Sequence, residues 1–211
     1  MTDFSEYEKI KKEIGENTAL MAVSKTKTAR EIIPFLQIGQ RIFGENRVEE
    51  AAEKWLPLKQ EYPDTELHLI GHLQRNKIKE ALLIFDSIDT LDNFELADKI
   101  AAELAKTPSD VKFMIQVNTG DEEQKTGIST KQADEFISYC LDSLKLNVTG
   151  LMCIPPQEDE PAPHFAFLAQ IAKRHGLKEL SMGMSADYML AVQQGATMVR
   201  IGTLLFGKRE Q

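Results

Sequence analysis

Short apolar runs recur along the chain, and each is followed by a segment whose apolar positions repeat at the spacing of a helix. Runs of this length without polar alternation are typical of strands that are buried on both faces of a sheet. The pattern predicts eight strands, at residues 19–24, 41–44, 67–71, 84–88, 112–118, 148–153, 179–182 and 198–202. Strands that alternate with helices indicate a parallel sheet.

The helical segments carry recognisable start and stop signals. The stretch 92–95 has the residues of a capping box and should begin a helix. Further helical patterns cover residues 136–144, 164–175 and 186–194. The last two are followed by Gly176 and Gly195, and glycine is the residue type that most often ends helices. Pro34 and Pro57 fall inside helical patterns, and we expect each to kink or end its helix.

Eight alternating units predict one closed (β/α)8 barrel of the TIM type over residues 1–211. After the last strand too few residues remain for a covering helix. We therefore expect the N-terminal segment 4–14 to form an extra helix on that side of the barrel. A doubly wound open sheet is the rival fold, but the glycine-rich nucleotide fingerprint of that fold is missing.

Composition and charge narrow the classes of function. The net charge of −8 argues against a nucleic-acid partner, because phosphate backbones require clustered Lys and Arg. The charged start MTDFSEYEKIKKEIGE does not resemble a signal peptide, and no run approaches the roughly 18 apolar residues of a membrane span. Cys140 and Cys153 lack zinc or redox spacing, so we expect reduced structural cysteines, no metal site and a cytoplasmic location.

The ends of the predicted strands carry most of the candidate chemistry. In barrels of this kind the functional groups come from the C-terminal ends of the strands. At or just after these ends the sequence has Lys25, Asn46, His72, Asn118, Met152, Ser185, Arg200, Gly202 and Thr203. We therefore expect these residues to gather on one rim.

The last two of these loops predict a phosphate site, because barrels often bind phosphate between the loops after strands seven and eight. Ser185 stands where a helix N-cap is expected, and Ser185 and Ala186 can offer a hydroxyl and an amide to an anion. Gly202 allows close approach of the backbone, and Thr203 adds a hydroxyl and an N–H. A plain N-cap with a glycine turn is the alternative.

Lys25 ends the first strand, in the stretch ALMAVSKT. Closure of the barrel would place it beside the eighth strand and its phosphate loop. A neutral lysine amine can attack a carbonyl, and burial or a neighbouring cation such as Arg200 would favour the neutral form. A lysine, an arginine and a phosphate site together predict a phosphorylated aldehyde as the ligand. The alternative is an ordinary surface lysine, as we expect for Lys27.

Six stretches together resemble the pyridoxal phosphate homeostasis protein family: AVSKTK, FGENRVEE, HLIGHLQRNK, GLMCIPP, GMSADYMLAVQQGATMVRIGT and LLFGKR. They span nearly the whole chain and are specific in combination. The resemblance implies a barrel like the N-terminal domain of alanine racemase, with pyridoxal 5′-phosphate as the cofactor. It also implies an internal aldimine between that cofactor and the lysine of the first strand, which is Lys25 here.

The resemblance further implies how the rest of the rim binds the cofactor. Ser185, Gly202 and Thr203 would hold the phosphate, Arg200 would face the pyridine nitrogen, and Asn46 would lie near the oxygen side. Met152, within GLMCIPP, is counted among the cofactor-binding residues as well. An arginine partner stays protonated and leaves the ring nitrogen unprotonated, so the ring is a poorer electron sink than with a carboxylate partner. We expect no catalytic residue and little or no turnover.

Two loops depart from the family pattern. The family commonly has IGPLQ where this chain has IGHLQ, and His72 there is more often a solvated or loop-packing residue than a contact to the cofactor or a partner. The stretch 118–120 is closer to a racemase, which leaves a substrate contact open. His68, inside the third strand, is interpreted as a satisfied core residue, although a ring near a pyridine could stack.

Three functions remain open on these residues. The first is storage, buffering or delivery of pyridoxal phosphate by a monomeric protein, with apoenzymes that use the cofactor as candidate partners. The second is a pyridoxal phosphate-dependent amino-acid racemase, which needs two acid–base groups on opposite faces of the substrate. Lys25 could be one, but the chain offers no evident second group. The third is a cofactor-free lysine aldolase that acts on a sugar phosphate. We expect the first.

Overall fold

The computed structural model describes residues 3–207. Within that range the strands are β1 (Ala19–Val23), β2 (Ile42–Glu45), β3 (Glu66–Leu69), β4 (Ser87–Leu91), β5 (Lys112–Asn118), β6 (Ile128–Ser129), β7 (Val148–Met152), β8 (Glu179–Ser181) and β9 (Met198–Ile201). The helices are α1 (Ser5–Ile14), α2 (Ala29–Gln37), α3 (Val48–Glu61), α4 (Ile78–Ile84), α5 (Phe94–Lys106), α6 (Ala133–Ser138), α7 (Pro161–Arg174), α8 (Tyr188–Gln193) and α9 (Thr203–Phe206), with the short turns η1 (Arg75–Lys77) and η2 (Tyr139–Ser143). Lys208 and Arg209 of the LLFGKR stretch lie outside the described residues.

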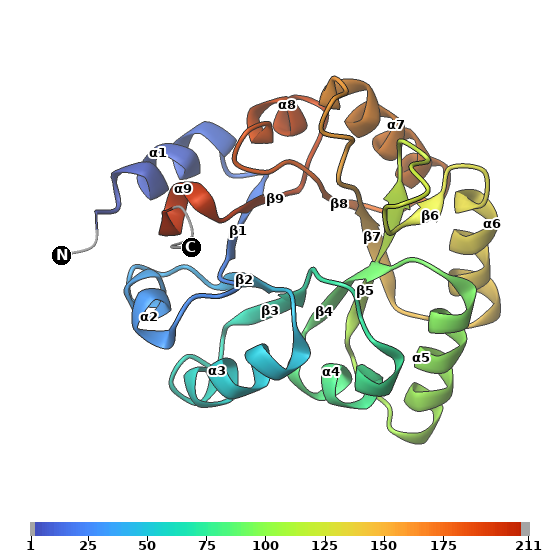
Figure 1. Cartoon of the computed structure of the whole chain (residues 1–211), viewed down its shortest axis with the longest axis horizontal. Helices are drawn as coiled ribbons and strands as arrows, with labels where there is room; N and C mark the ends of the chain where they lie inside the picture. Colours follow the sequence, from blue (N-terminus) through green and yellow to red (C-terminus); the bar gives the residue numbers. More distant parts are fainter. Residues whose placement is uncertain (1–2, 208–211) are drawn as a thin grey trace.

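The main sheet closes into a barrel (Figure 1). Its hydrogen-bonded order runs β4-β3-β2-β1-β9-β8-β7-β5, and β4 also pairs with β5, so these strands form a complete ring. Every pairing is parallel, and β1 meets β9 with Met21 opposite Arg200. The predicted (β/α)8 barrel is therefore confirmed, and the C-terminal ends of its strands form one rim.

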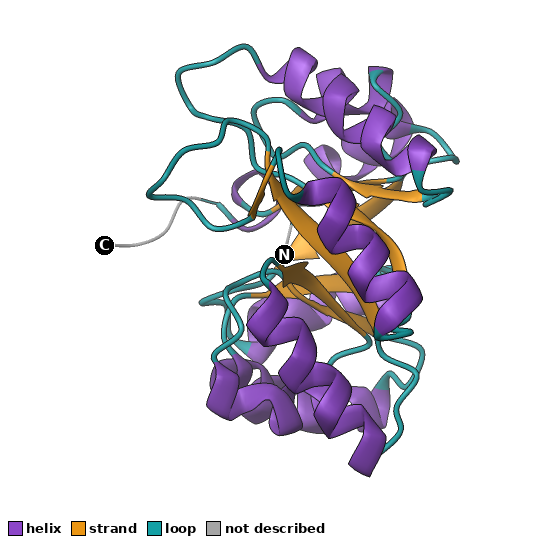
Figure 2. Cartoon of the chain, turned by 90° about the vertical axis from the view of Figure 1, so that its right-hand side faces the viewer, coloured by secondary structure: helices purple, strands orange, loops and turns teal. Residues whose placement is uncertain are grey.

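Helices cover the outside of the ring of strands (Figure 2). Phe43 of β2 packs on Trp55 of α3, with ring centroids 4.8 Å apart and both side chains fully buried. Burial of large apolar side chains of this kind stabilises the fold by roughly 1.5–3 kcal/mol each. The packing fixes how α3 lies against the barrel, which matters for the site described below.

The extra N-terminal helix is also confirmed. Tyr7, Ile10 and Ile14 of α1 are spaced three and four residues apart and are all buried. Helix α1 contacts β1, α8 and α9, so it covers the side of the barrel where α9 is too short to do so (Figure 1). The two ends of the described chain therefore lie on the same side of the molecule.

The fourth strand lies three residues later than predicted, at Ser87–Leu91. Ile84 instead ends α4, and Phe85 lies in the connection between α4 and β4. The reason is chemical: β4 is buried throughout, yet it carries the polar residues Ser87, Asp89 and Thr90. A search for apolar runs cannot detect such a strand. The two-residue β6, which pairs with β5 outside the ring, was not predicted either.

Both internal prolines are tolerated by their helices. Helix α2 continues past Pro34 and α3 past Pro57, so of the two predicted outcomes, a kink or an end, these prolines do not end their helices. A proline in a helix interior costs about 3 kcal/mol or more. Each helix buries a large apolar face in compensation, which in α3 includes Trp55 and Leu58. Packing against the barrel therefore outweighs the local preference.

Candidate functional site

A cavity of about 380 Å³ opens at the C-terminal rim of the barrel. It is lined by Val23, Lys25, Asn46, Ile70, Met152, Ile154, Met184, Ser185, Ala186, Arg200, Gly202 and Thr203. All seven residues that the sequence predicted for the site are among these. The structure thus brings together residues from the ends of β1, β2, β7 and β9 and from the loop after β8, as parallel strands in a closed ring require.

Lys25 stands just beyond the tip of β1. Val23 and Lys25 are two residues apart, so both face the cavity, and Lys25 is half-buried. The next residue, Thr26, has a φ of 65°, in the left-handed region that β-branched residues seldom adopt. The Thr26 amide donates to Glu50 Oε1 at 2.5 Å. This sharp turn leads the chain away from the strand and leaves Lys25 at the edge of the cavity.

The loop after β8 presents two backbone amides. The Asp187 amide donates to the Met184 carbonyl at 3.0 Å, and the Asp187 carboxylate accepts from the Met184 amide at 2.6 Å. Ser185 and Ala186 are the central residues of this turn, and within residues 3–207 their amides donate to no other backbone group. Helix α8 begins at Tyr188 with Asp187 before it, so the predicted N-cap role of Ser185 is wrong. Asp187 takes that position because its carboxylate closes the turn.

The loop after β9 presents two more backbone amides, those of Gly202 and Thr203. Gly202 and Thr203 begin the short helix α9, and the first amides of a helix have no acceptor inside it. A Cβ atom on Gly202 would make only ordinary contacts of 3.4 Å with Val23. The packing of the protein itself therefore does not require glycine here, and the space that Gly202 leaves is open to the cavity. Four amides and two hydroxyls from these two loops form a set of donors suited to an anion.

Arg200 supplies a buried cation at the cavity. Its Nη1 donates to the carbonyl of Ser181 at 2.6 Å and to the hydroxyl at 2.9 Å, and its Nη2 donates to the carbonyl of Cys153 at 2.8 Å. Burial lowers the pKa of Arg200 from its ordinary value, which is so high that the guanidinium stays protonated. Within residues 3–207 the hydrogen-bond acceptors of its side chain are all neutral oxygens, so no direct ion pair neutralises its charge.

Apolar side chains and Asn46 complete the walls. Ile70, Met152 and Ile154 line the cavity and suit a flat ring rather than a second charged group. Asn46 is half-buried, and its backbone is closely covered by the loop after β3. A Cβ atom on Gly71 would fall 2.2 Å from the Asn46 carbonyl oxygen. The backbone of Asn46 can therefore lie this close to the neighbouring loop only because residue 71 is a glycine.

His72 and Asn118, from the two loops that depart from the family pattern, lie outside the cavity. His72 is exposed and lines a separate rim groove with Gln74 and Lys77. Asn118 is satisfied inside its own loop, where its side chain donates to the carbonyl of Glu122 at 2.8 Å and accepts from the Glu122 amide at 3.2 Å. Neither residue lines the cavity, so the solvated interpretation of His72 is the one that the structure favours.

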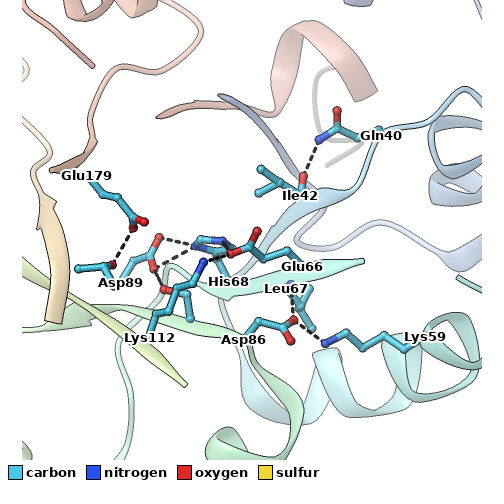
Figure 3. A network of polar contacts seen from close by, with 12 residues as sticks. Gln40, Ile42, Lys59, Glu66, Leu67, His68, Asp86, Asp89, Lys112 and Glu179 are labelled. Atoms are coloured by element: carbon cyan, nitrogen blue, oxygen red, sulfur yellow. Dashed lines mark hydrogen bonds and ion pairs between the residues drawn. The ribbon is translucent and has the colours of Figure 1, made fainter. Parts of the chain in front are cut away.

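His68 belongs to a polar network in the barrel interior (Figure 3). Its Nδ1 lies 2.9 Å from Asp89 Oδ2, and the Ser87 hydroxyl donates to Asp89 Oδ1 at 2.6 Å. Its Nε2 lies 3.4 Å from Glu66 Oε1, an ion-pair distance without the alignment of a hydrogen bond, and Lys112 Nζ lies 3.0 Å from the same oxygen. His68 is buried and does not line the cavity, so its place in the core is confirmed, although its Nε2 has no hydrogen-bond partner within the described residues.

Lys27 is less exposed than expected of a surface lysine. Only 16% of its side chain is exposed, because its Nζ donates to Glu31 Oε1 at 3.0 Å and to the carbonyl of Phe206 at 3.1 Å. The bond to Phe206 ties the loop after β1 to α9, and the bond to Glu31 ties it to α2. The expectation of a solvated Lys27 is therefore wrong, and the reason is the position of the C-terminal helix, which the sequence pattern does not reveal.

Sequence reasoning also missed a buried polar cluster on the side of β1 away from the cavity. We call Ser24, Glu45, Glu50, Lys54 and Trp55 the Lys54 cluster. Glu45 is fully buried, and its Oε1 accepts from the Ser24 hydroxyl at 2.5 Å and from Trp55 Nε1 at 2.9 Å. The same oxygen forms an ion pair with Lys54 Nζ at 2.8 Å. The available signal was Glu45 itself, a charged residue that directly follows the predicted strand 41–44.

Two kinds of feature are not found in the described part of the chain. No helix within residues 3–207 has the length and apolar character needed to cross a membrane. No three His, Cys, Asp or Glu side chains in that range gather in a way that could hold a metal ion.

Comparison with known proteins identifies relatives of this chain. Residues 5–210 match the family described as alanine racemase, N-terminal domain. The chain is 40% identical over 206 residues to the pyridoxal phosphate homeostasis protein of Aquifex aeolicus, covering 93% of this chain and 90% of that protein. It is 38% identical over 205 residues to the protein of the same name from Escherichia coli K12, covering 92% and 87%.

Solved structures agree with these matches. PipY of Synechococcus elongatus PCC7942, in the structure with PLP bound, superposes with a TM-score of 0.86 at 33% identity, covering 96% of this chain and 98% of that one. An alanine racemase of Clostridium difficile superposes with a TM-score of 0.77 at 16% identity. That match covers 98% of this chain but 56% of the racemase, and it shows likeness in fold alone.

Proposed function

We propose a function for this chain on the basis of its family: the chain belongs to the pyridoxal phosphate homeostasis protein family. The protein binds pyridoxal 5′-phosphate in the cavity at Lys25 and stores, buffers or delivers this cofactor. The observation that carries the proposal is the meeting of Lys25, Arg200 and the loops after β8 and β9 in one cavity. The names of the relatives and the PLP-bound PipY structure support the same ligand.

The chemistry of the lining residues fits this ligand. A phosphate group needs several N–H and O–H donors, and Ser185, Ala186, Gly202 and Thr203 offer them from two loops. A flat pyridine ring suits the apolar walls. Arg200 would face the ring nitrogen and Asn46 the phenolic oxygen side, while Met152 would pack against the ring. Lys25 is the amine of this set that can react with an aldehyde.

The covalent step that we propose is reversible and needs no second reactant. The lone pair of the Lys25 amine adds to the aldehyde carbon, and loss of one water leaves a C=N Schiff base at Nζ. Water reverses the step and releases the aldehyde. A link that forms and breaks without oxidation or reduction is suited to holding a cofactor temporarily.

We propose that no residue of the chain acts as a catalyst on a substrate. Racemisation requires a second acid–base group opposite Lys25, and in known alanine racemases such a group is supplied from outside the barrel. None of the tyrosines in residues 3–207 lines the cavity. Tyr188, which follows the loop after β8, is buried and donates to Glu13. Arg200 would also leave the ring nitrogen unprotonated, which weakens its pull on electrons.

The wider setting follows from the same residues. We propose that residues 1–211 form one binding domain and that the protein acts as a monomer, because a single chain supplies the complete cavity. The buried free thiols of Cys140 and Cys153 are consistent with the reducing cytoplasm. Apoenzymes that use the cofactor are the proposed receivers, and neither nucleic acid nor membrane is a partner.

The test is chemical trapping on the purified protein. Wild type mixed with pyridoxal 5′-phosphate should develop Schiff-base absorbance, and borohydride reduction followed by peptide mass analysis should place the adduct on Lys25. Lys25→Ala should give neither signal, whereas the control Lys79→Ala, at an exposed lysine of α4, should behave as wild type. An adduct on another lysine would contradict the proposal. Conversion of an L-amino acid to its D form would favour the racemase instead, and trapping of a sugar phosphate by colourless protein the aldolase.

A further inference from the structure

We propose that Lys54 is a positioning residue for Lys25: its buried ammonium holds the loop that carries Lys25 and so sets how readily that amine reaches an aldehyde in the cavity. The inference rests on the proposed function of the cavity. Lys54 itself does not line the cavity, so it would act only through the loop.

The ammonium of Lys54 bonds to both ends of this loop. Its Nζ donates to the carbonyl of Ser24 at 2.9 Å and to the carbonyl of Lys27 at 3.0 Å. These carbonyls lie on either side of the pair Lys25 and Thr26. Only 7% of the Lys54 side chain is exposed, so solvent competes little for these bonds. One buried cation on α3 therefore bridges the turn in which Lys25 stands.

Two carboxylates hold the ammonium in this place. Glu45 Oε1 lies 2.8 Å and Glu50 Oε1 3.1 Å from Lys54 Nζ. The same oxygen of Glu50 accepts from the Thr26 amide at 2.5 Å. The loop is thus held through its carbonyls by Lys54 and through an amide by Glu50, and each of these side chains is held by the other.

The backbone of the loop needs such support. Thr26 has a φ of 65°, a conformation that is unfavourable for a β-branched residue and persists only where neighbouring groups hold it. The amide and the carbonyls around Thr26 are those that Glu50 and Lys54 bind. Without these bonds we expect the loop to relax, which would rotate Lys25 relative to the cavity.

The cluster is also anchored to the barrel on the strand side. Glu45, the last residue of β2, is fully buried. It accepts from the hydroxyl of Ser24, the residue that precedes Lys25. A buried ion pair is weak evidence for stability, because well-packed apolar residues can often replace it without loss. The placement of this pair directly behind Lys25 therefore points to control of the loop rather than to support of the fold.

The experiment compares two ligands in two variants. Lys54→Met removes the charge at nearly constant side-chain length. The control Lys59→Met makes the same change five residues further along α3, where the lysine pairs with Asp86. Pyridoxal 5′-phosphate can form the Schiff base, whereas pyridoxine 5′-phosphate has an alcohol in place of the aldehyde and can only bind non-covalently. Dissociation constants for both ligands and the rate of Schiff-base absorbance are measured.

We expect Lys54→Met to slow Schiff-base formation and weaken pyridoxal 5′-phosphate binding by about tenfold or more, because a misplaced nucleophile reacts slowly. Its affinity for pyridoxine 5′-phosphate should stay close to that of wild type, and Lys59→Met should match wild type with both ligands. Unchanged kinetics in Lys54→Met would overturn the inference. So would equal losses with both ligands, which would mean that Lys54 supports the whole cavity.

A second variant keeps the test decisive if Lys54→Met does not fold. Glu50→Gln, at a partly exposed side chain, weakens the bonds to the Thr26 amide and to Lys54 and should show the same selective loss. Failure of the proposed function is recognised separately. It appears in wild type alone, as the absence of any adduct on Lys25, whereas failure of the positioning role appears only in the variants.

Discussion

Arg200 is bound to Ser181 through a single nitrogen that donates twice, to the backbone carbonyl at 2.6 Å and to the hydroxyl at 2.9 Å. Its other terminal nitrogen donates to the carbonyl of Cys153 at 2.8 Å. The acceptors belong to neighbouring strands or strand ends, so the barrel itself fixes the plane of the guanidinium. Because all of these acceptors are neutral, the cation is oriented without being neutralised. This combination suits a group that must face a ligand.

Replacement of Arg200 by lysine should therefore be costly although the charge is kept. A lysine has one nitrogen and cannot serve all the acceptors, and each buried acceptor left without a donor costs about 1–3 kcal/mol. We expect Arg200→Lys to lower the free energy of unfolding in urea by about 2–4 kcal/mol. Ser181→Ala, which removes only the hydroxyl acceptor, should cost about 1 kcal/mol. Equal losses in the two variants would show that the orienting bonds contribute little.

The loop after β8 should not tolerate a side chain at Gly183. This residue has a φ of +90°, and a Cβ atom there would lie 2.5 Å from Ala191 Cβ and 3.0 Å from Tyr188 Cα. Strain and overpacking together should lower the free energy of unfolding of Gly183→Ala by about 2–4 kcal/mol. Ligand affinity should fall as well, since the turn at Ser185 would shift.

Gly176 provides the matched control for that substitution. It has a φ of +68°, but nothing lies within 4 Å of the position that a Cβ atom would take. Gly176→Ala should therefore show the backbone strain alone, about 1 kcal/mol, and leave ligand affinity unchanged. Urea unfolding and ligand titration of both variants measure the difference. Similar stability losses in the two would contradict the close packing of the loop on α8.

The rim of the barrel could be predicted because parallel strands bring their C-terminal ends together whatever their loops do. Lys25 and Arg200 are 175 positions apart in number, yet each stands at a strand end, so the strand pattern alone placed them in one cavity. The detail of the loops could not be derived in this way. Asp187 rather than Ser185 closes the turn before α8, because two polar residues compete for that place and only the folded loop decides between them.

The polar interior could not be predicted either. The fourth strand was predicted three residues too early because the inward residues of β4 are Ser87 and Asp89, which bond to each other and, through Asp89, to His68 inside the barrel. Lys54 escaped because a lysine on a helix is ordinarily solvated, and its burial depends on the rotation of α3 about its axis. Both features are charged or polar groups whose partners come from other elements. Hydrophobic periodicity has no information about such pairings.

The His68 network should make stability depend on pH. Burial by itself lowers the pKa of His68, but the charge of Asp89, the hydrogen bond with Asp89 and the ion pair with Glu66 outweigh it and raise the pKa to about 10. Because the pKa is raised in the folded state, protonated His68 stabilises the fold in full below the unfolded pKa of about 6.5. This stabilisation is lost as pH rises through the folded pKa. The ion pair with His68 is the largest influence on Glu66 and lowers its pKa from 4.5 to about 2, so the contribution of Glu66 to stability is lost as pH falls through that range.

We therefore expect the free energy of unfolding of wild type to decline between pH values of about 6.5 and 10 more steeply than that of His68→Gln, which lacks the titration. At a pH of about 6 the variant should be less stable by about 3–5 kcal/mol, because Asp89 is left as an unpaired buried charge. His72→Gln, at an exposed histidine of the rim, serves as the control and should keep the wild-type slope. Parallel curves for wild type and His68→Gln would contradict a protonated His68.

Trp55 and Glu45 should be energetically coupled. Trp55 is the single tryptophan of the chain, and its indole N–H donates to the fully buried Glu45 carboxylate at 2.9 Å. Trp55→Phe keeps an aromatic ring against Phe43 but removes this donor, and we expect a loss of about 2–3 kcal/mol because hydrogen bonds to charged groups contribute more than neutral ones.

A double-mutant cycle with Glu45→Gln isolates the hydrogen bond from the packing. Urea unfolding followed by circular dichroism should give a coupling energy of about 1–2 kcal/mol, in the range measured for residues in direct contact. The pair Trp55→Phe and Ser181→Ala, which share no partner in the structure, should be additive within about 0.5 kcal/mol. Additivity of Trp55→Phe and Glu45→Gln would mean that the indole N–H does not hold the carboxylate. In that case Glu45 would depend on Ser24 and Lys54 alone for its position behind Lys25.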